Sequence, residues 1–295
     1  MSTSDIEFAK MSYKDKTNRE LDLDNPCTFD EKLWYLKLSN RDPLLTKCSD
    51  KNLVREYMEE CGLGHILNEL YGVYDNAKDI DFYRLPSSCF FKCNHTSGYN
   101  ITFDRDKPFD KKDFVLKFNF ILHQNYYWVS REWNYKNIKP KIVAEKVLRD
   151  DKGKFPTDYK FLCFDGIPKL MYLAIGTCTE SGAHAKTEDR YINTYDMNFN
   201  LTEIEEGFPI YRGYVEKPKT FKLTQDYADI LAGPFPHCRV DFYEDKGQII
   251  FGEITFYDGG GYNNIQPEEL AVKVVVWIDL SSYKITPDAL NPDSI

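Results

Sequence analysis

The first third of the chain mixes polar stretches with short amphipathic segments, a pattern typical of helices. Residues 1–26 are polar and charged, and they predict a loosely ordered arm. Thr28–Glu31 is a capping box, so we expect a short helix through the apolar residues that follow it. Ser49-Asp50 predicts the cap of a second helix over residues 51–61, and a third helix is expected at 65–70.

After Ser88 the pattern changes to short runs of β-branched and aromatic residues, which predict strands. Two longer segments keep a helical character, and one polar segment has no clear period. The predicted strands are 89–93, 101–103, 140–148, 158–164 and 169–175, the last two as a hairpin around Asp165-Gly166; the predicted helices are 110–134 and 221–231; residues 176–216 are expected to be irregular.

A second hairpin near the C-terminal end carries the main candidate chemistry. Residues 239–243 and 251–256 are rich in β-branched and aromatic side chains, and 244–247 predicts the turn between them. The loop can have two or three residues, and its length sets the register. We prefer three residues with Gly247 in the left-handed conformation.

In the three-residue register, Asp241 pairs with Phe251, and Arg239 pairs with Glu253. Arg239, Asp241, Glu253 and Thr255 then share one face, because side chains alternate along a strand. The two carboxylates become diagonal neighbours about 7–8 Å apart at Cα, a span that Mg²⁺ can bridge. An arginine beside them suits a phosphate. The two-residue loop would instead place the acids on opposite faces.

The simplest alternative is an ordinary hairpin with acids on its solvated face. Two features argue against it. The strands are otherwise too apolar for such a face, and the run Gly259-Gly260-Gly261 follows them, which lets backbone approach a ligand closely.

Three lysines are candidates for binding a phosphate tail. Lys51 lies at an expected helix start, where backbone N–H groups favour anions. Lys92 and Lys160 each lie inside an apolar strand, where a charge is costly unless it reaches water or a partner. Any one of them could simply extend its ammonium group to solvent. Together with the acidic hairpin they favour phosphate binding.

Composition narrows the class of protein. The chain has 295 residues, enough for two or three subdomains, and a formal net charge of -9, which argues against nucleic acid and anionic membranes as partners. The eight cysteines are scattered, and Cys89, Cys93 and His95 have no second ligand pair nearby, so buried thiols are expected. No signal peptide and no membrane span are visible. These features predict a cytoplasmic protein with reduced cysteines.

In five blocks, taken in order, the chain resembles the ATP-grasp enzymes, and within them the teichuronopeptide-biosynthesis (TupA-like) branch. The resemblance covers nearly all of residues 27–280. The blocks are Cys48–Arg55, Phe91–Gly98, Ile142–Leu148, Asp158–Gly166, and the hairpin formed by Arg239–Asp241 with Phe251–Phe256.

The resemblance implies an α+β ATP-grasp fold with the nucleotide held between two subdomains. Its expected division is a mainly helical region at 1–86, a central lid at 87–148 and a C-terminal subdomain at 149–295. The cofactors that it implies are ATP and Mg²⁺. It implies phosphate contacts for Lys92 and Lys160, and more weakly for Lys51, beneath a phosphate-covering loop that contains Ser97 and Gly98. It implies an adenine-binding hinge at Glu145, Lys146, Val147 and Leu148. It also implies Mg²⁺ ligands at Asp241 and Glu253, and Arg239 would stabilise the transferred phosphoryl group.

Two positions depart from the family pattern. Many ATP-grasp enzymes carry Asn two residues after the metal-binding Glu, whereas this chain has Thr255, whose hydroxyl can still bind Mg²⁺ or a water on it. The covering loop has one glycine, Gly98, where several are usual.

The resemblance implies a carboxylate–amine ligase that acts through an acyl phosphate, in capsule or cell-surface polysaccharide biosynthesis. Its partners would be small-molecule or glycan carboxylates and amines, and the oligomeric state stays open. In the segment 176–216, Arg190 is a candidate for gripping the substrate carboxylate, with Gly259 and Gly260 lining the same pocket; a plain surface loop is the equal alternative.

Two other functions stay open. A metal-dependent glycosyltransferase is suggested by three short Asp-x-Asp patterns, at residues 22–24, 79–81 and 104–106, although the pattern is frequent in an acidic chain. A non-catalytic carbohydrate-binding or scaffold protein could use the many Tyr and Phe side chains for stacking. That function gives no role to Lys92, Lys160 or the acidic hairpin.

Overall fold

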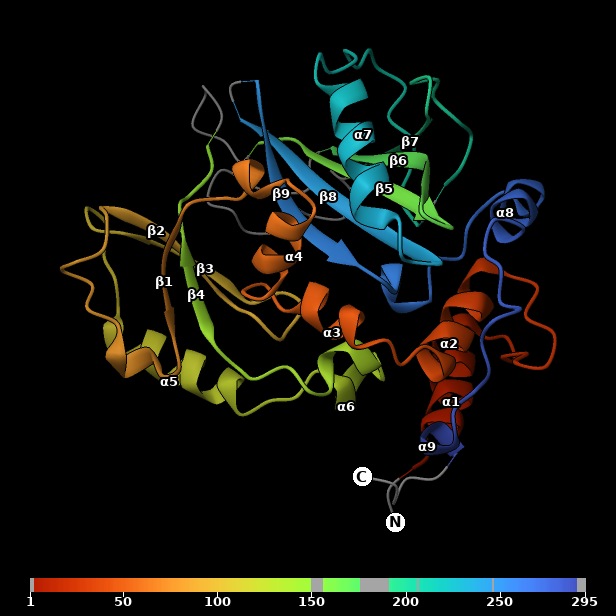
Figure 1. Ribbon diagram of the computed structural model, residues 1–295, viewed down its shortest axis with the longest axis horizontal. Coiled ribbons are helices and arrows are strands. Elements are labelled where there is room, and N and C mark those ends of the chain that lie inside the picture. Colours follow the sequence, from red (N-terminus) through yellow and green to blue (C-terminus); the bar gives the residue numbers. More distant parts are fainter. Residues whose placement is uncertain (1–2, 150–155, 176–190, 206, 246, 291–295) are drawn as a thin grey trace. The chain divides into compact units, whose positions relative to one another are not determined.

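The computed structural model of the chain describes residues 3–149, 156–175, 191–205, 207–245 and 247–290 (Figure 1). The chain forms two compact units. Unit 1 comprises Met1–Arg41, Thr157–Tyr243 and Ile254–Ile295, and unit 2 comprises Asp42–Pro156 and Glu244–Glu253. The described residues form a four-stranded sheet in the order β1-β4-β2-β3 and a five-stranded sheet in the order β7-β6-β5-β8-β9. Both sheets are antiparallel, so the chain is an α+β protein.

The elements follow one another in the order that Figure 1 labels. The helices are α1 Asp5–Thr17, α2 Phe29–Ser39, α3 Pro43–Ser49, α4 Val54–Glu60, α5 Lys111–Leu122, α6 Tyr127–Ser130, α7 Phe221–Ala232, α8 Glu268–Val275 and α9 Pro287–Leu290. The strands are β1 Leu70–Tyr74, β2 Ser88–Cys93, β3 Asn100–Asp104, β4 Ile142–Glu145, β5 Asp158–Phe164, β6 Ile167–Ile175, β7 Tyr191–Asp196, β8 His237–Asp245 and β9 Gln248–Thr255. Short 3₁₀ turns lie at Gly64–Ile66, Ala77–Asp79, Trp133–Tyr135 and Asp258–Gly260.

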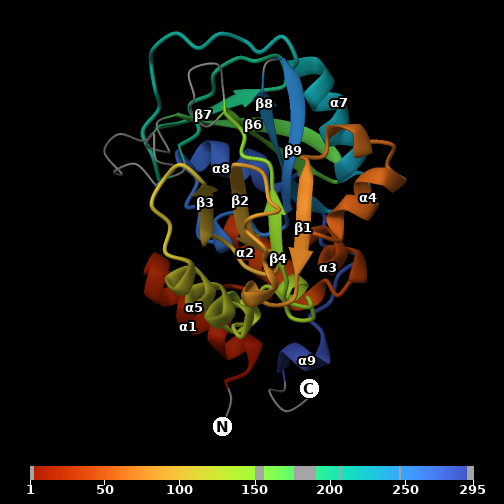
Figure 2. The ribbon, with the colours of Figure 1, turned by 90° about the vertical axis from the view of Figure 1, so that its left-hand side faces the viewer.

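In unit 2, α5 packs across one face of the four-stranded sheet (Figure 2). Alternation along β2 directs Cys89, Phe91 and Cys93 into this core, where Phe91 meets Phe114 with ring centroids 4.9 Å apart. The same alternation directs Lys92 to the opposite face. The aromatic content of this part of the sequence therefore builds a core, and the lysine lies outside it.

In unit 1, α7 packs on one face of the five-stranded sheet. Phe161 on β5 contacts Phe221 at the start of α7, with ring centroids 5.9 Å apart. Lys160 therefore lies on the other face of the sheet, because neighbours in a strand point to opposite sides. The register of β5 and β8 pairs Lys160 with Asp241 and Leu162 with Arg239. These pairings bring the candidate residues of two distant segments together.

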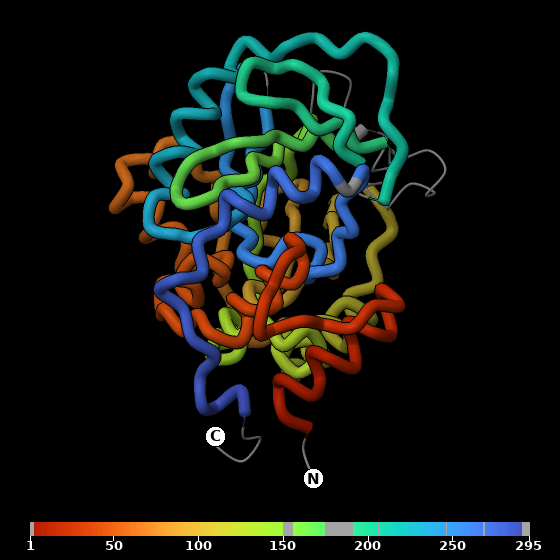
Figure 3. Tube along the Cα trace, turned by 90° about the vertical axis from the view of Figure 1, so that its right-hand side faces the viewer, coloured from red at the N-terminus to blue at the C-terminus, as the bar shows by residue number. Residues whose placement is uncertain are grey.

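The expectation of a loose N-terminal arm is wrong. Residues from Asp5 onward form α1, which a capping box of Ser4 and Glu7 begins. Ala9 and Tyr13 are buried against α2 and against Ala289 of α9, in a cluster that joins the two ends of the chain (Figure 3). Because α1 buries few apolar side chains, the helix depends on these distant partners, which its own sequence does not indicate.

Several other predicted elements need correction. A 3₁₀ turn at Gly64–Ile66 replaces the helix expected at 65–70. The helix expected over 110–134 ends at Leu122, and the short helix α6 and a 3₁₀ turn follow it. The strand expected over 140–148 is shorter in the structure, where β4 spans Ile142–Glu145. Strand β7 lies within the segment expected to be irregular, because it pairs with the edge of β6.

The elements with strong local signals are confirmed. Thr28 and Glu31 form the predicted capping box of α2. Strands β5 and β6 form the predicted hairpin, with Asp165 and Gly166 at positive φ in its turn. Helix α7 spans one residue more than expected. The division into residues 1–86, 87–148 and 149–295 stays a proposal, in which β1 from the first range pairs with β4 from the second.

Among the described residues, no helix combines the length and the apolar character needed to cross a membrane.

One buried histidine predicts how stability depends on pH. His237 on β8 is 2% exposed and lies against Phe29 and Phe164, with centroid distances of 5.2 and 4.8 Å, and neither ring nitrogen has a hydrogen-bond partner among the described residues. Burial lowers the pKa of His237 from 6.5 to about 4. Between these two values the unfolded chain binds a proton that the folded chain does not, so the free energy of unfolding falls as the pH drops from 6.5 to 4.

The substitution His237→Phe should remove up to about 3 kcal/mol of this loss, since each pKa unit corresponds to about 1.4 kcal/mol. Urea unfolding at pH 7.5, 6.0 and 5.0 measures the effect. At pH 7.5 the histidine is neutral in both states, so the difference between variant and wild type there reports packing alone. Equal slopes against pH for the two proteins would contradict the prediction.

Candidate active site

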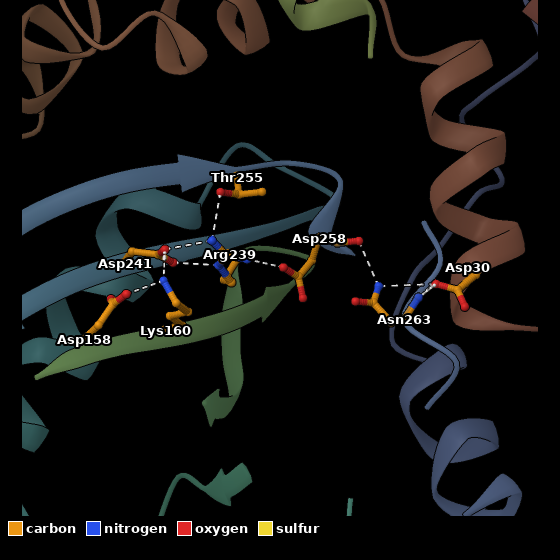
Figure 4. A network of polar contacts seen from close by, with 8 residues as sticks. All are labelled: Asp30, Asp158, Lys160, Arg239, Asp241, Thr255, Asp258 and Asn263. Carbon is orange, nitrogen blue, oxygen red and sulfur yellow. Dashed lines mark hydrogen bonds and ion pairs between the residues drawn. The ribbon is translucent and has the colours of Figure 1, made fainter. Parts of the chain in front are cut away.

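The centre of the candidate site in unit 1 is a buried carboxylate held by two cations. Asp241 on β8 is 1% exposed. Arg239 donates to it in a bidentate manner, with Nε 2.7 Å from Oδ1 and Nη2 2.8 Å from Oδ2, and Lys160 Nζ lies 2.6 Å from Oδ2 (Figure 4). Burial alone would raise the pKa of Asp241, but Arg239 and Lys160 outweigh it and lower the pKa. The carboxylate is therefore charged and fixed in place.

Two further groups fix the Arg239 guanidinium. Its Nη2 donates to Thr255 Oγ1 on β9 at 3.3 Å, and its Nη1 contacts the carboxylate of Asp258. Arg239, Asp241 and Thr255 therefore share one face, as the sequence predicted. The sequence pattern did not indicate Asp258, because its contact with Arg239 depends on the turn after β9.

Asp158 is a second missed residue, and it lies two positions before Lys160 on the same face of β5. Its Oδ2 is 2.5 Å from Lys160 Nζ, and its Oδ1 is buried without a hydrogen-bond partner among the described residues. Burial raises the pKa of Asp158 to about 6, against the attraction of Lys160. Lys160 thus lies between two carboxylates. The spacing Asp-x-Lys in a predicted strand could have indicated this pair, because residues two apart in a strand lie on the same face.

The position of Glu253 follows from the strand that carries it. Alternation along β9 places Glu253 on the same face as Thr255. Gly247 has φ +78°, so the predicted left-handed conformation is confirmed. The residue-by-residue register of β8 with β9 stays a prediction, and so does the sharing of a metal by Asp241 and Glu253.

Unit 2 contains a second charged group, on the sheet face away from α5. Lys92 Nζ on β2 is 2.7 Å from Glu145 Oε2 on β4, and Arg55 Nη1 on α4 is 3.9 Å from Glu145 Oε1. Glu145 is 5% exposed, so this carboxylate is held by its cations much as Asp241 is. Arg55 was not predicted as a site residue.

Lys51 is tied to the expected phosphate-covering loop. Its Nζ donates to the carbonyl of Thr96 at 2.8 Å, and its backbone N–H donates to Asn94 O at 3.3 Å. Burial lowers the pKa of Lys51; among the charges near it, Glu253 opposes and Lys92 reinforces this shift. The Thr96 hydroxyl is buried without a hydrogen-bond partner in the described part of the chain.

The remaining loop and hinge residues follow the predicted segments. Ser97 and Gly98 are exposed in the turn after β2, and Gly98 has φ +77°. After Glu145, the backbone of Lys146 is already engaged, because its N–H donates to Glu69 O and its carbonyl accepts from Asn68, both at 2.9 Å. Val147 and Leu148 are half-buried outside β4.

Some predicted residues are not brought together by the described structure. Lys92 belongs to unit 2 and Lys160 to unit 1, so their convergence on one nucleotide stays a prediction. Arg190 lies outside the described residues. Gly259 and Gly260 form a 3₁₀ turn after β9 with φ of +54° and +65°. Cys89 and Cys93 are buried thiols whose pKa values burial raises to about 12.

The residues present fit the two ligands that the resemblance implies. Among the described residues, no group of three or more His, Cys, Asp and Glu side chains forms a closed metal site. Asp241, Glu253 and Thr255 carry oxygen atoms, the kind of ligand that Mg²⁺ prefers, and their assembly into one metal site stays a prediction. The lysines and the unpartnered Thr96 hydroxyl provide donors for phosphate oxygens.

Comparisons with solved structures find ATP-grasp ligases. D-alanine–D-alanine ligase from Bacillus anthracis shares 15% identity, with 72% of this chain and 59% of that chain covered and a TM-score of 0.42. L-amino acid ligase from Bacillus licheniformis shares 13%, covering 74% and 45%, at 0.39. ATP-grasp ligase PsnB, in a complex with a precursor variant, Mg and ADP, shares 9%, covering 80% and 61%, at 0.42. The chain spans about half to three fifths of the length of these proteins.

Comparison at the level of sequence is more decisive. No curated protein matches the chain. A model of the TupA-like ATP-grasp family matches residues 31–273. This range includes both charged groups and all five blocks of the sequence resemblance. The chain therefore belongs to the TupA-like ATP-grasp family.

Proposed function

We propose that this protein is an ATP- and Mg²⁺-dependent ligase that joins a carboxylate to an amine. The observation that carries the proposal is the buried Asp241, held by Arg239 and Lys160 on strands that lie within the residues matched by the family model. An arrangement with two fixed cations and little acid–base machinery suits phosphoryl transfer, in which catalysis is mainly positioning and charge stabilisation.

In the proposed reaction, a carboxylate oxygen of the substrate attacks the γ-phosphorus of ATP, and ADP leaves. The amine nitrogen then attacks the acyl carbon of the resulting acyl phosphate, inorganic phosphate leaves, and the nitrogen loses one proton to solvent. Lys160, Lys92 and Lys51 bind phosphate oxygens, and Arg239 stabilises the charge that develops on the transferred group and on the acyl oxygen. We assign the adenine to Glu145 and the residues that follow it.

Bound Mg²⁺ would neutralise phosphate charge and orient the γ-phosphate. Asp241, Glu253 and Thr255 are the residues that would hold it. Asp241 is fixed by Arg239, so its oxygens keep one orientation without the metal. The Thr255 hydroxyl accepts from Arg239, and its oxygen is a ligand of the kind that Mg²⁺ takes directly or through a water.

We further propose a substrate from capsule or cell-surface polysaccharide biosynthesis, with a uronic-acid or amino-acid carboxylate. This part rests on the family alone. Arg190, Gly259 and Gly260 remain the candidates for the acceptor pocket.

A thermal-shift panel of ATP, ADP, UDP and UDP-sugars with Mg²⁺ tests the nucleotide. Binding to the folded state raises the unfolding midpoint, and a hundredfold excess over Kd adds roughly 2.7 kcal/mol of stability. We expect ATP and ADP to raise the midpoint and UDP to have little effect. A response to UDP and UDP-sugars alone would contradict the proposal and favour a glycosyltransferase.

The substitution Glu253→Gln tests the metal. It removes one charge from the proposed Mg²⁺ ligands at nearly constant volume, so Mg²⁺-dependent ATP turnover should fall at least a hundredfold while the circular dichroism spectrum stays the same. Glu244→Gln, in the same hairpin, is the matched control and should keep its activity. An unchanged turnover number in Glu253→Gln would remove the metal assignment.

The substitution Asp158→Asn tests whether Lys160 is available to phosphate. Asp158 competes for the ammonium group at 2.5 Å, so a neutral amide there should tighten ATP binding several-fold, measured by calorimetry at pH 7.5. Asp226→Asn is the control, since Asp226 forms a similar 2.6 Å pair with Lys222 on the surface of α7. Weaker ATP binding in Asp158→Asn than in the control would show that Asp158 assists the nucleotide.

A further inference from the structure

Helix α2 presents one face to the turn that follows strand β9. Asp30, Trp34 and Lys37 are spaced at i, i+4 and i+7, so they lie on one side of the helix. Asp30 accepts from the backbone N–H groups of Asn263 and Asn264, at 2.8 and 2.9 Å. These contacts lie within unit 1.

Trp34 and Lys37 hold the glycines of the same turn. A Cβ atom on Gly261 would lie 3.1 Å from the Trp34 ring, closer than an ordinary van der Waals contact, and φ there is +76°, so a side chain at this position would be strained. Lys37 Nζ donates to the carbonyl of Gly260 at 2.7 Å. One face of α2 therefore contacts the turn from Gly260 to Asn264.

Ordering the backbone of this turn costs conformational entropy. Gly259, Gly260 and Gly261 all have positive φ, of +54°, +65° and +76°. Three consecutive glycines lose much conformational freedom when they are ordered, so the turn needs outside contacts to keep one shape.

The shape of the turn reaches the candidate site through Asp258. Asn263 Nδ2 donates both to Asp30 Oδ1 at 3.3 Å and to the carbonyl of Asp258 at 2.8 Å. The side chain of Asp258 contacts Arg239. Figure 4 shows this line of contacts from Asp30 to Arg239.

Burying the Lys37 ammonium group to hold this turn costs free energy of desolvation. The side chain is 1% exposed, and its ammonium group lies 3.8 Å from the centroid of the Trp34 ring and 5.8 Å from those of Tyr257 and Tyr262. An ammonium group is rarely buried so completely, because it loses its hydration, and an apolar side chain of the same length would fill the space. The charge adds the polar contact with Gly260 and a cation–π contact with the Trp34 ring.

We propose that Lys37 is a positioning residue, which together with Asp30 holds the turn 258–264 in the one shape that aims Arg239 at the transferred phosphoryl group. The inference rests on the proposed function. Lys37 does not touch the nucleotide in this scheme; it acts through Gly260 and Asp258.

The test compares Mg-ADP with Mg-ADP plus aluminium fluoride, which mimics the phosphoryl group in transfer. Both are measured by calorimetry on the full chain, so no acceptor substrate is needed. In Lys37→Met the affinity for Mg-ADP should stay within twofold of wild type, whereas the tightening by aluminium fluoride should fall at least tenfold. A merely structural lysine would not separate the two affinities.

Lys32→Met is the matched control on the same helix. Lys32 Nζ also donates to backbone carbonyls, Val275 O at 2.9 Å and Ile278 O at 2.6 Å, but these lie at the end of α8, away from the turn. This variant should have a lower unfolding midpoint and full tightening by aluminium fluoride. Asp30→Asn provides a second variant on the turn itself, with the same expected loss as Lys37→Met, should the latter not fold.

The outcomes distinguish a failure of the positioning role from a failure of the proposed function. If wild type binds Mg-ADP and tightens with aluminium fluoride, but Lys37→Met and Asp30→Asn tighten equally, the positioning role is overturned and the proposed function stands. If wild type does not bind Mg-ADP, or does not tighten, the proposed function itself fails.

Discussion

The ion triad around Asp241 is the constraint on which the unit 1 site depends. A carboxylate that is 1% exposed is tolerable only with strong partners, and removing one partner from such a buried group typically costs about 3–5 kcal/mol. Lys160 comes from β5 and Arg239 from β8, so the triad forms only in the observed register. A slip by one residue would turn every side chain of a strand to the other face. The register that buries Phe161 under α7 is therefore also the one that assembles the charges.

The pair of Lys92 with Glu145 in unit 2 obeys the same rule. Its sheet buries Cys89, Phe91 and Cys93 against α5, and the intervening lysine must find a partner on the other face. In both units, then, the cations are held by carboxylates before any ligand is considered. Under the proposed function, phosphate would have to compete with these carboxylates for cations whose side chains are already ordered.

The N-terminal helices support the unit 1 site through their contacts with the turn after β9. Residues 3–41 are far from the hairpin in sequence, but α2 contacts the turn from Gly260 to Asn264, and Ser12 and Tyr13 of α1 contact Tyr262. Glycines with positive φ give the backbone freedom, and the helices remove that freedom again. The turn therefore packs closely against the helices and keeps one backbone conformation, which a glycine loop without these contacts would not keep.

The sequence by itself determined the elements whose signals are local. Alternation in β2, β5 and β8 placed Lys92, Lys160 and Asp241 correctly within their strands, and the capping box at Thr28 located α2, because these patterns depend on neighbours a few residues away. Only the tertiary structure decided the partners: Asp158 and Asp258 in the charged cluster, Lys37 on Gly260, and the packing of α1 against α2 and α9. Each of these depends on contacts between segments far apart in the chain, and a local pattern carries no information about which distant groups a fold will bring within hydrogen-bonding distance.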